Sequence, residues 1–462
     1  MVDQHPQTRN TRNLPSPHPS PGLLEDQMFL KRIKINDLRS IDEIEIDFSD
    51  ARGNTRGRTV LLGENGCGKS TALRAIALLL AGGDALAELL KEPERWVRNK
   101  HKQARIEATL STKSGAEREV SLVLRPEWNL RETLKHNERG LSALDDALKH
   151  SRRSYFIMGY GVTRRPALGA KEFSNVAERG GHSSSRARAL ATMFTPDATL
   201  VSFEQWAMDL DYTGGKAASA TLKQAMAKLL PGMKFDRIDR KRRELLFRTV
   251  DGVIPFQQLS DGYQNVANWC GDMLYRITTT FEDYKSPLKT RGLLLIDELD
   301  LHLHPVWQRR LMEFLRSALP QMQIVATSHS PMIAQQLREG ELYVVERPGP
   351  RKGAVIRAVS GDPSQLTLPQ LMSPMFGIDS MESVRVQNLR KQARAGSVTP
   401  EVRQELAELT RIEALPPAMQ KQVKAVEEMT LALSMATGIE RPRLDPEKLK
   451  ARIRQKIKLQ NS

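Results

Sequence analysis

The chain has few cysteines, few aromatic residues and no long apolar segment. Its two cysteines, Cys67 and Cys270, are too few for a framework of disulfide bonds, so a reducing cytoplasm is the simplest compartment. No run reaches the roughly 18 apolar residues of a membrane-spanning helix, because even the stretch from Ala72 to Ala81 contains Arg74. The N-terminus lacks the apolar core of a secretory signal. We therefore expect a soluble cytoplasmic protein.

Positive charge is abundant instead. The net charge of +15 favours anionic partners, nucleic acid first, although a basic surface that binds nothing is a common alternative. Basic residues are densest in residues 237–243 and in the tail from Lys448 to Lys458. The tail either contacts DNA phosphates or is a solvated helix end, and the second is favoured. The charge alone therefore leaves open whether the chain binds DNA.

Residue patterns along the chain predict an α/β fold after a disordered arm. Residues 1–26 are rich in Pro, Ser, Thr, Asn and Arg, and they contain too few apolar side chains to fold. Alternating or short apolar runs predict strands at residues 29–35, 44–48, 59–62, 106–110, 120–124, 155–158, 245–250, 293–296 and 323–326. Helical patterns occupy residues 69–80, 180–230 and most of the chain after Gly377. We expect a mixed sheet with covering helices, an antiparallel β subdomain and a helical C-terminal extension.

A phosphate-binding loop stands between a predicted buried strand and a predicted helix. The pattern G-x-x-x-x-G-K-[ST] is matched by Gly63, Glu64, Asn65, Gly66, Cys67, Gly68, Lys69 and Ser70. Glycines let backbone N–H groups turn around a phosphate, and the following helix directs its positive end toward that phosphate. Lys69 is expected to reach the β- and γ-phosphates of ATP, Ser70 to hold Mg²⁺, and Thr71 to join the nucleotide-binding set.

A second acidic element completes this predicted site. The aliphatic run Leu293–Ile296 predicts a central strand that delivers Asp297 to the edge where ligands gather in open α/β sheets. Asp297 is expected to complete the Mg²⁺ shell, and Glu298 to polarise the attacking water as a general base. Asp300 is assigned to a loop that faces a second subunit rather than to the metal. Taken alone, an apolar-Asp-Glu run is an ordinary strand end about as often as it is a functional site. Its combination with the phosphate-binding loop favours a functional site.

Two further elements separate the classes of P-loop protein. Residues 259–264 begin a predicted helix with Ser260 at its N-cap, and they comprise Leu259, Ser260, Asp261, Gly262, Tyr263 and Gln264. This hexapeptide resembles the signature of ABC ATPases in its RecF-like and OLD-like form. Residues 326–331, Ala-Thr-Ser-His-Ser-Pro, end a strand and resemble the switch-histidine segment of the same families, with His329 in the catalytic position.

The resemblance covers about residues 28 to 345. Arg39-Ser40 resembles the segment after the first strand in RecF-like chains, so Arg39 is implied in nucleotide binding, although Leu38 replaces the usual Phe. His302 and His304 resemble the loop that faces a second subunit, and two imidazoles without a third ligand make a poor zinc site. The segment Ile157–Arg165 lacks the Gln that ABC enzymes usually carry. Its Gly-Tyr-Gly-x-x-Arg form resembles a subset of anti-phage ATPases, and the role of Arg164 stays open between nucleotide contact, hinge and DNA contact.

The resemblance implies an ABC-type ATPase head that hydrolyses ATP as a head-to-tail dimer, with Ser260, Asp261, Gly262 and Tyr263 acting on the nucleotide of the other copy. The 189 residues between Ser70 and Ser260 exceed what a transporter domain needs, and no heptad array of an SMC protein occurs. The implied lobes are residues 27–165 and 251–345 for the ATPase head, 166–250 for a helical lobe and 346–462 for a helical region. The helices of residues 380–435 either dock a partner or cap the core.

Three functions remain open at this point. The resemblance to Septu, retron-associated and PARIS ATPases implies a sensor ATPase of an anti-phage system with a separately encoded nuclease effector. The alternative is a RecF-like DNA-repair ATPase, and the third is a scaffold with negligible turnover, which Glu298 disfavours. Residues 346–462 contain no acidic cluster of the Toprim kind and no histidine, so we expect no nuclease site there.

Overall fold

The structure is a computed structural model, and it describes residues 28–112, 116–150, 156–167, 185–213, 234–249, 252–280, 287–349, 352–378, 382–394, 400 and 404–405. The chain divides into two compact units, Met1–Asp379 and Ser380–Ser462. The expected N-terminal arm, the basic tail and most of the helices expected in residues 380–435 lie outside the described residues. Within the described part of the chain, no helix is long and apolar enough to cross a membrane.

A six-stranded sheet forms the centre of the first unit, in the order β13-β12-β3-β11-β10-β6. Five of these strands are parallel, and β13 pairs antiparallel with β12 at the edge. The strands are β3 (Arg58–Leu62), β6 (Ile157–Tyr160), β10 (Gly292–Ile296), β11 (Met322–Ser328), β12 (Leu342–Glu346) and β13 (Val355–Ala358). Because the five strands are parallel, their carboxyl ends meet at one edge of the sheet, where ligands bind in such folds.

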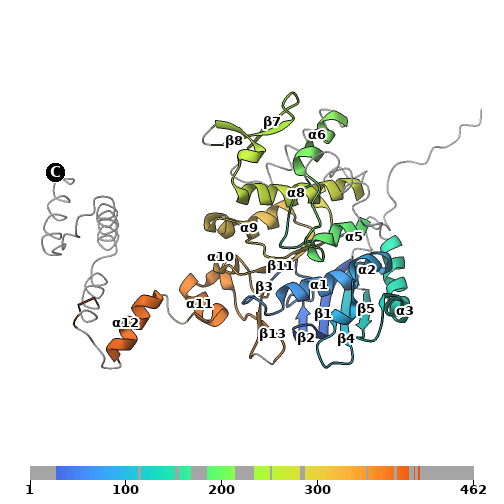
Figure 1. Cartoon of the computed structure of the whole chain (residues 1–462), viewed down its shortest axis with the longest axis horizontal. Helices are drawn as coiled ribbons and strands as arrows, with labels where there is room; N and C mark the ends of the chain where they lie inside the picture. The colour runs from blue at the N-terminus through green and yellow to red at the C-terminus, as the bar shows by residue number, and fades with distance from the viewer. Residues whose placement is uncertain are drawn as a thin grey trace, which may run out of the picture. The chain divides into compact units, whose positions relative to one another are not determined.

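Side-chain alternation explains why both faces of this sheet are covered. On β10, Leu293 and Leu295 pack into one hydrophobic cluster, while Leu294 and Ile296 pack into the other. Helix α1 (Lys69–Leu80) lies on the first face, between the six-stranded sheet and a four-stranded antiparallel sheet (Figure 1). Helices α8 (Asp261–Thr280) and α9 (Pro305–Ala318) contribute to the cluster on the opposite face. The continuous apolar runs of the sequence follow from this double burial.

The four-stranded sheet has the order β2-β1-β4-β5 and is entirely antiparallel. Its strands are β1 (Met28–Leu38), β2 (Ile41–Asp47), β4 (Ala104–Thr112) and β5 (Glu117–Leu124). They confirm the half-buried strands and the hairpin that apolar alternation predicts. The helices near this sheet are α2 (Gly83–Leu89), the 3₁₀ helix η2 (Pro93–Trp96) and α3 (Leu130–His150).

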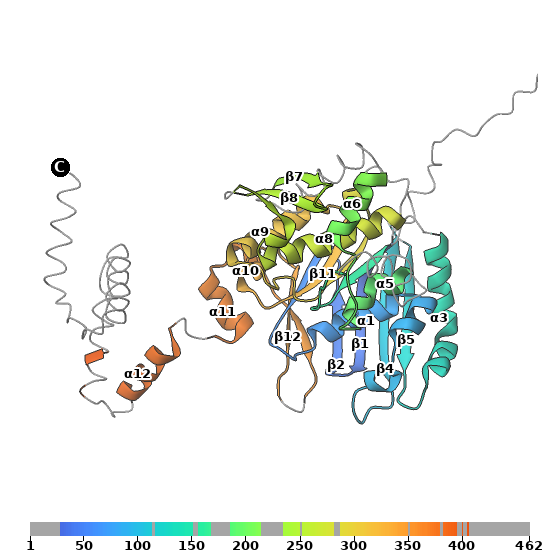
Figure 2. The same cartoon turned by 45° about the horizontal axis from the view of Figure 1, so that its top comes forward.

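A smaller three-stranded sheet, β7-β8-β9, lies on the α8 side of the molecule (Figure 2). Its strands are β7 (Lys234–Asp239), β8 (Glu244–Thr249) and β9 (Gly252–Pro255), followed by η5 (Phe256–Gln258). Phe247 and Phe256 anchor it in the hydrophobic cluster that contains Trp269 of α8. Part of the expected helical lobe is described as α5 (Ser185–Leu190), η4 (Ala191–Met193) and α6 (Phe203–Thr213), and residues 168–184 and 214–233 lie outside the described residues.

The expected α/β class is confirmed, and the region from residue 346 begins differently from the expectation. β13 occupies Val355–Ala358 inside the segment expected to be helical, where its backbone pairs antiparallel with β12 at the edge of the sheet. The remaining elements are η6 (Pro287–Lys289), α10 (Pro331–Ala334), η7 (Pro363–Gln365) and α11 (Leu368–Phe376) in the first unit, and α12 (Val384–Arg394) in the second. Residues 346–378 therefore belong to the first compact unit.

Asp272, on α8, is a buried acidic residue whose carboxylate accepts several hydrogen bonds in the core. Its carboxylate is fully buried and accepts hydrogen bonds from the Tyr160 hydroxyl at 2.9 Å, the Val201 N–H at 2.9 Å and the Arg276 guanidinium at 2.6 Å. Replacing it by Ala leaves a buried guanidinium without its counter-charge, which costs about 3–5 kcal/mol. We predict a loss of that size for D272A in denaturant unfolding, whereas E43Q, which breaks an exposed pair with Lys34, leaves the midpoint near that of the unmodified protein. An unchanged midpoint for D272A would contradict this account.

Candidate nucleotide site

The loop of residues 63–70 connects β3 to α1, as the sequence predicts. Gly63 has φ 151°, and a Cβ there would lie 2.2 Å from the backbone oxygen of Val345. Gly68 has φ 108° and directly precedes the first residue of α1. Both positions need glycine, one for close approach and one for left-handed backbone. The loop thus brings its N–H groups to the start of a helix, where an anion is stabilised.

Lys69 lies folded into this loop. Its Nζ donates to the backbone oxygens of Gly63 at 2.9 Å and Glu64 at 2.8 Å. Burial lowers the pKa of Lys69, and the nearby Cys67 sulfur and Asp297 carboxylate act in the opposite direction. The ammonium group is therefore held within the loop by neutral acceptors, which a phosphate would outcompete because it carries charge.

Asp297 connects the loop to the central strands. Its Oδ1 accepts hydrogen bonds from the Ser70 hydroxyl at 2.9 Å and from the Thr327 hydroxyl at 2.7 Å. The carboxylate is only 1% exposed. Ser70 and Asp297, the two residues expected to hold Mg²⁺, thus lie side by side with hard oxygen atoms, which is the donor type that Mg²⁺ prefers. The residues present fit such an ion.

Glu298 and His329 line one cavity with the phosphate-binding loop. The cavity has a volume of about 190 Å³ and is lined by Ser40, Asn65, Gly66, Gly68, Lys69, Ser70, Thr71, Glu298 and His329. The backbone of Glu298 is left-handed, with φ 51°, and its N–H donates to the Thr327 hydroxyl at 2.7 Å. A carboxylate, an imidazole and an ammonium therefore share a space bounded by backbone N–H groups, which suits an anionic ligand and a water nucleophile.

Asp300 holds the turn that carries His329. Its Oδ1 accepts hydrogen bonds from the Ser328 hydroxyl at 2.6 Å and from the His329 N–H at 3.3 Å. Burial lowers the pKa of His329 and the charge of Lys69 lowers it further, whereas the nearby carboxylates, Asp300 first, act in the opposite direction. The expected assignment of Asp300 to a loop facing another subunit leaves out this contact, which lies within the chain.

The signature residues lie apart from this cavity. Helix α8 begins at Asp261, and Ser260 precedes it, with the Gln264 N–H donating to the Ser260 oxygen at 3.0 Å. The Tyr263 hydroxyl accepts a hydrogen bond from Trp307 Nε1 at 3.0 Å. A Cβ at Gly262 would lie 2.6 Å from the backbone oxygen of His302. Ser260 and Asp261 are exposed, so this helix start is available to a ligand outside the cavity of its own chain.

Comparisons with known proteins assign both halves of this site. Residues 28–121 match the family model described as AAA ATPase domain. Residues 168–334 match the model described as AAA domain, putative AbiEii toxin, Type IV TA system. Both segments are therefore similar to AAA ATPase domains. They include the phosphate-binding loop in the first segment and the signature, Asp297 and His329 in the second, so nucleotide binding is the shared property.

Curated relatives match over part of their length. Septu protein PtuA of Bacillus mycoides is 27% identical over 356 residues, which are 76% of this chain and 45% of that protein. Retron Ec83 probable ATPase of Escherichia coli is 29% identical over 126 residues, 27% of this chain and 23% of that protein. The chain thus spans less than half the length of these relatives.

Similar solved structures have low identity. An Smc head bound to the C-winged helix domain of ScpA has a TM-score of 0.44 and 15% identity, covering 72% of this chain and 98% of that one. The recombination mediator protein RecF-ATPrS has a TM-score of 0.41 and 12% identity, covering 73% and 100%.

Arg39, in the first matched segment, is not among the residues that line the cavity. Its guanidinium stacks 3.6 Å from the centre of the Trp96 ring, and its backbone N–H donates to the Trp96 oxygen at 2.9 Å. Burial lowers the pKa of Arg39, with a further contribution from the charge of Arg74. The neighbouring Ser40 lines the cavity instead, and its position next to Arg39 in the RecF-like motif is the signal that could have identified it. Nucleotide contact by Arg39 stays a prediction.

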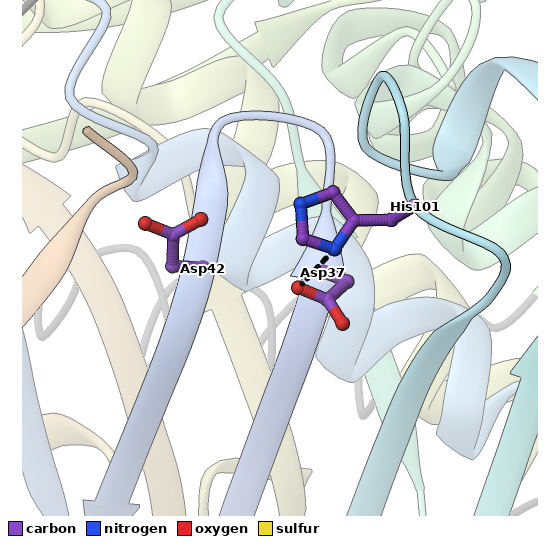
Figure 3. Close-up of side chains that lie close together, drawn as sticks. All are labelled: Asp37, Asp42 and His101. Atoms are coloured by element: carbon purple, nitrogen blue, oxygen red, sulfur yellow. Dashed lines mark ion pairs between the residues drawn. The ribbon is translucent and has the colours of Figure 1, made fainter. Parts of the chain in front are cut away.

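A different cluster of possible metal ligands lies in the first matched segment, and its carboxylates already have partners. Asp37, Asp42 and His101 converge at one end of β1 and β2 (Figure 3). Asp37 pairs with His101 Nδ1 at 2.9 Å, while Asp42 pairs with Arg98 at 2.8 Å and accepts the Gly353 N–H at 2.7 Å. Because Arg98 already neutralises Asp42, we assign no metal here.

His304, one of the two histidines of the predicted loop after Glu298, is the N-cap of α9. Its side chain accepts a hydrogen bond from the Val306 N–H.

The position of Lys69 leads to a direct test of the site. Replacing Lys69 by Met removes the one ammonium group of the cavity while keeping the length of the side chain. Because a hydrogen bond to a charged group contributes about 1.5–3 kcal/mol, we predict nucleotide affinity lower by roughly 10- to 100-fold, measured by titration with a fluorescent ATP analogue. The control is K102M, an exposed lysine outside this cavity. Equal affinities for K69M and the unmodified protein would show that nucleotide binds elsewhere.

Proposed function

We propose that this chain is an ABC-type ATPase that dimerises around ATP and serves as the sensor subunit of an anti-phage defence complex with a separate nuclease effector. One observation carries the catalytic part. The ends of β3, β10 and β11 bring Lys69, Glu298 and His329 to one cavity. The signature helix α8 begins at residues that do not line this cavity. The site of a single copy thus lacks the element that the ABC resemblance assigns to the γ-phosphate.

The chemistry follows from the positions of the side chains. Lys69 neutralises charge on the β- and γ-phosphates, and α1 directs its positive end toward them. Ser70 and Asp297 would hold Mg²⁺, which when bound offsets phosphate charge. Glu298 accepts a proton from the attacking water as the general base, since it supplies the carboxylate among the residues that line the cavity. His329 lines the same cavity, so its imidazole is placed to donate a hydrogen bond to the transferring phosphate.

Dimerisation follows from the exposed signature. In the proposed dimer, Ser260 and Gly262 of one copy meet the γ-phosphate held by the other, and the N–H groups at the start of α8 stabilise it. ATP then connects two copies, and hydrolysis releases them. The nucleotide would control assembly rather than yield a chemical product.

Trapping the nucleotide tests this mechanism. Changing Glu298 to Gln removes the general base and keeps the size of the side chain, so ATP should bind without being cleaved. We predict that E298Q with ATP and Mg²⁺ elutes as a dimer or larger assembly in size-exclusion chromatography with light scattering. The double variant E298Q/K69M is the control and should stay monomeric. An E298Q protein that binds ATP and still elutes as a monomer would contradict the proposed dimer.

The defence role is supported by the relatives. Two of them are named Septu protein PtuA and Retron Ec83 probable ATPase, and the Gly-Tyr-Gly-x-x-Arg segment resembles the same group. Copurification of the chain with the products of its native operon, followed by ATPase and plasmid-cleavage assays, tests this role. A copurifying nuclease whose cleavage depends on Glu298 supports it. DNA-stimulated ATP turnover by the chain alone would favour a repair function.

A second candidate, direct DNA contact, rests on the β7–β8 hairpin. Its tip presents Lys241, Arg242 and Arg243 as exposed residues. The acidic Asp239 beside them accepts the backbone N–H groups of Lys241 at 3.0 Å and Arg242 at 3.1 Å, so it shapes the turn. Next to the tip, Arg240 lies 5.3 Å from the Tyr212 ring, which is 60% exposed. An exposed aromatic ring among basic side chains suits a nucleic-acid backbone with unstacked bases.

The salt dependence of DNA binding tests this hairpin. Each phosphate contact contributes about 0.9 to the slope of log affinity against log salt. We predict that changing Lys241, Arg242 and Arg243 to Ala reduces this slope by about 2–3, measured by fluorescence anisotropy on single-stranded and duplex DNA. The matched control changes three exposed basic residues elsewhere, Lys91, Arg95 and Lys102. Equal slopes for both triple variants would place DNA binding outside the hairpin.

A further inference from the structure

Arg164 is a buried arginine at the carboxyl edge of the central sheet. It is 7% exposed, and in the described part of the chain its hydrogen-bond acceptors are three backbone oxygens. Nε donates to the Gly161 oxygen at 2.9 Å, and Nη2 donates to the oxygens of Asp297 and Glu298, the latter at 2.9 Å. Burial lowers the pKa of Arg164 to about 10, so the side chain keeps its charge at neutral pH. Arg164 is therefore a buried cation whose hydrogen bonds go to the backbone.

The turn that Arg164 contacts has an unfavourable backbone conformation. Glu298 adopts φ 51°, which costs a non-glycine residue about 1–2 kcal/mol. Such conformations persist where surrounding contacts determine them. Here the Thr327 hydroxyl accepts the N–H of Glu298 from one side, and Arg164 binds its carbonyl oxygen from the other. Both peptide groups of Glu298 are therefore fixed, and the direction of its side chain into the cavity is fixed with them.

Arg164 is itself held by a closely packed segment. The Gly161 N–H donates to the Thr192 hydroxyl at 3.2 Å, and that hydroxyl donates to the Gly159 oxygen at 3.1 Å. A Cβ at Gly161 would lie 2.1 Å from the Thr192 backbone oxygen, so only glycine fits against η4. Tyr160 between the glycines donates to Asp272 of α8. The backbone segment that precedes Arg164 is therefore held by η4 on one side and by α8 on the other.

We propose that Arg164 is the positioning residue for Glu298, and that it acts through the backbone of the Asp297–Glu298 turn rather than through the substrate. This inference rests on the proposed ATP hydrolysis for its kinetic consequence. It assigns a purpose to the Gly159–Arg164 segment, where the usual Gln of ABC enzymes is missing. The guanidinium does not line the cavity, which separates its role from that of Lys69.

The test compares two buried arginines that make the same kind of contact. R164K keeps the charge but loses the planar fork, in which Nε donates to the Gly161 oxygen while Nη2 donates to the oxygens of Asp297 and Glu298. We expect kcat to fall about 10- to 100-fold, as for other residues that orient a catalytic group, while the Kd for a non-hydrolysable ATP analogue changes less than about threefold. The matched control is R58K. Arg58 is 6% exposed and donates to the oxygens of Leu315, Leu319 and Met322, at the opposite end of β3. Its kcat should stay within about twofold.

A double-mutant cycle separates positioning from a general structural role. If Arg164 acts through Glu298, R164K should not lower the residual single-turnover rate of E298Q any further. A structural role would lower that rate by the same factor in both backgrounds. Amide hydrogen exchange gives a readout without turnover: R164K should increase exchange in the peptide of residues 293–303, and R58K should not.

The outcomes are distinct for the two proposals. An R164K protein with the kcat and exchange of the unmodified chain overturns the role of Arg164, as does an equal loss of rate in the E298Q background. If the unmodified chain binds ATP but does not hydrolyse it, the proposed ATPase function fails instead. Hydrogen exchange at residues 293–303 then still decides whether Arg164 holds the turn.

Discussion

One buried oxygen atom, Oδ1 of Asp297, joins the parts of the nucleotide site. It accepts hydrogen bonds from Ser70 at the start of α1 and from Thr327 at the end of β11, so one acceptor connects the ends of β10 and β11 with the start of α1. A carboxylate that is 1% exposed needs such donors, because a buried charge without partners is costly. The same Thr327 hydroxyl accepts the N–H of Glu298. The residue expected at the metal and the residue expected to act as base are therefore set by one short network.

The sequence predicts the parts of this site that depend on local pattern. The strand before Gly63, the helix from Lys69 and the apolar run before Asp297 are found where periodicity places them, because double burial and glycine geometry leave direct marks in the residue order. The contacts that join these elements are made between residues far apart in the sequence, such as Arg164 and Asp297. No periodicity encodes them, and β13 was missed because a short exposed strand carries little apolar signal.

The Gly159–Arg164 segment shows how fold and site depend on each other. Gly159 and Gly161 have no side chains because η4 packs against the strand end, and this packing sets the start of Arg164. The two glycines, which carry no functional group, thus permit the contact between Arg164 and the Asp297–Glu298 turn. In this segment, the two glycines allow the close packing against η4, and that packing fixes the backbone from which Arg164 reaches the turn.

Tyr160 extends this unit to the signature helix. Its hydroxyl bonds Asp272, which lies in the middle of α8, whose first turn carries Asp261 and Gly262. The strand end that supports Arg164 therefore also supports the helix that would meet the nucleotide of a second copy. A displacement of α8 along its axis would break a buried hydrogen bond and an ion pair with Arg276, so it is opposed by the core. In the proposed dimer, each copy thus holds its own general base and the signature it offers to its partner on one buried support. If the proposed dimer forms, completion of one half-site would therefore depend on the same buried contacts that hold the other.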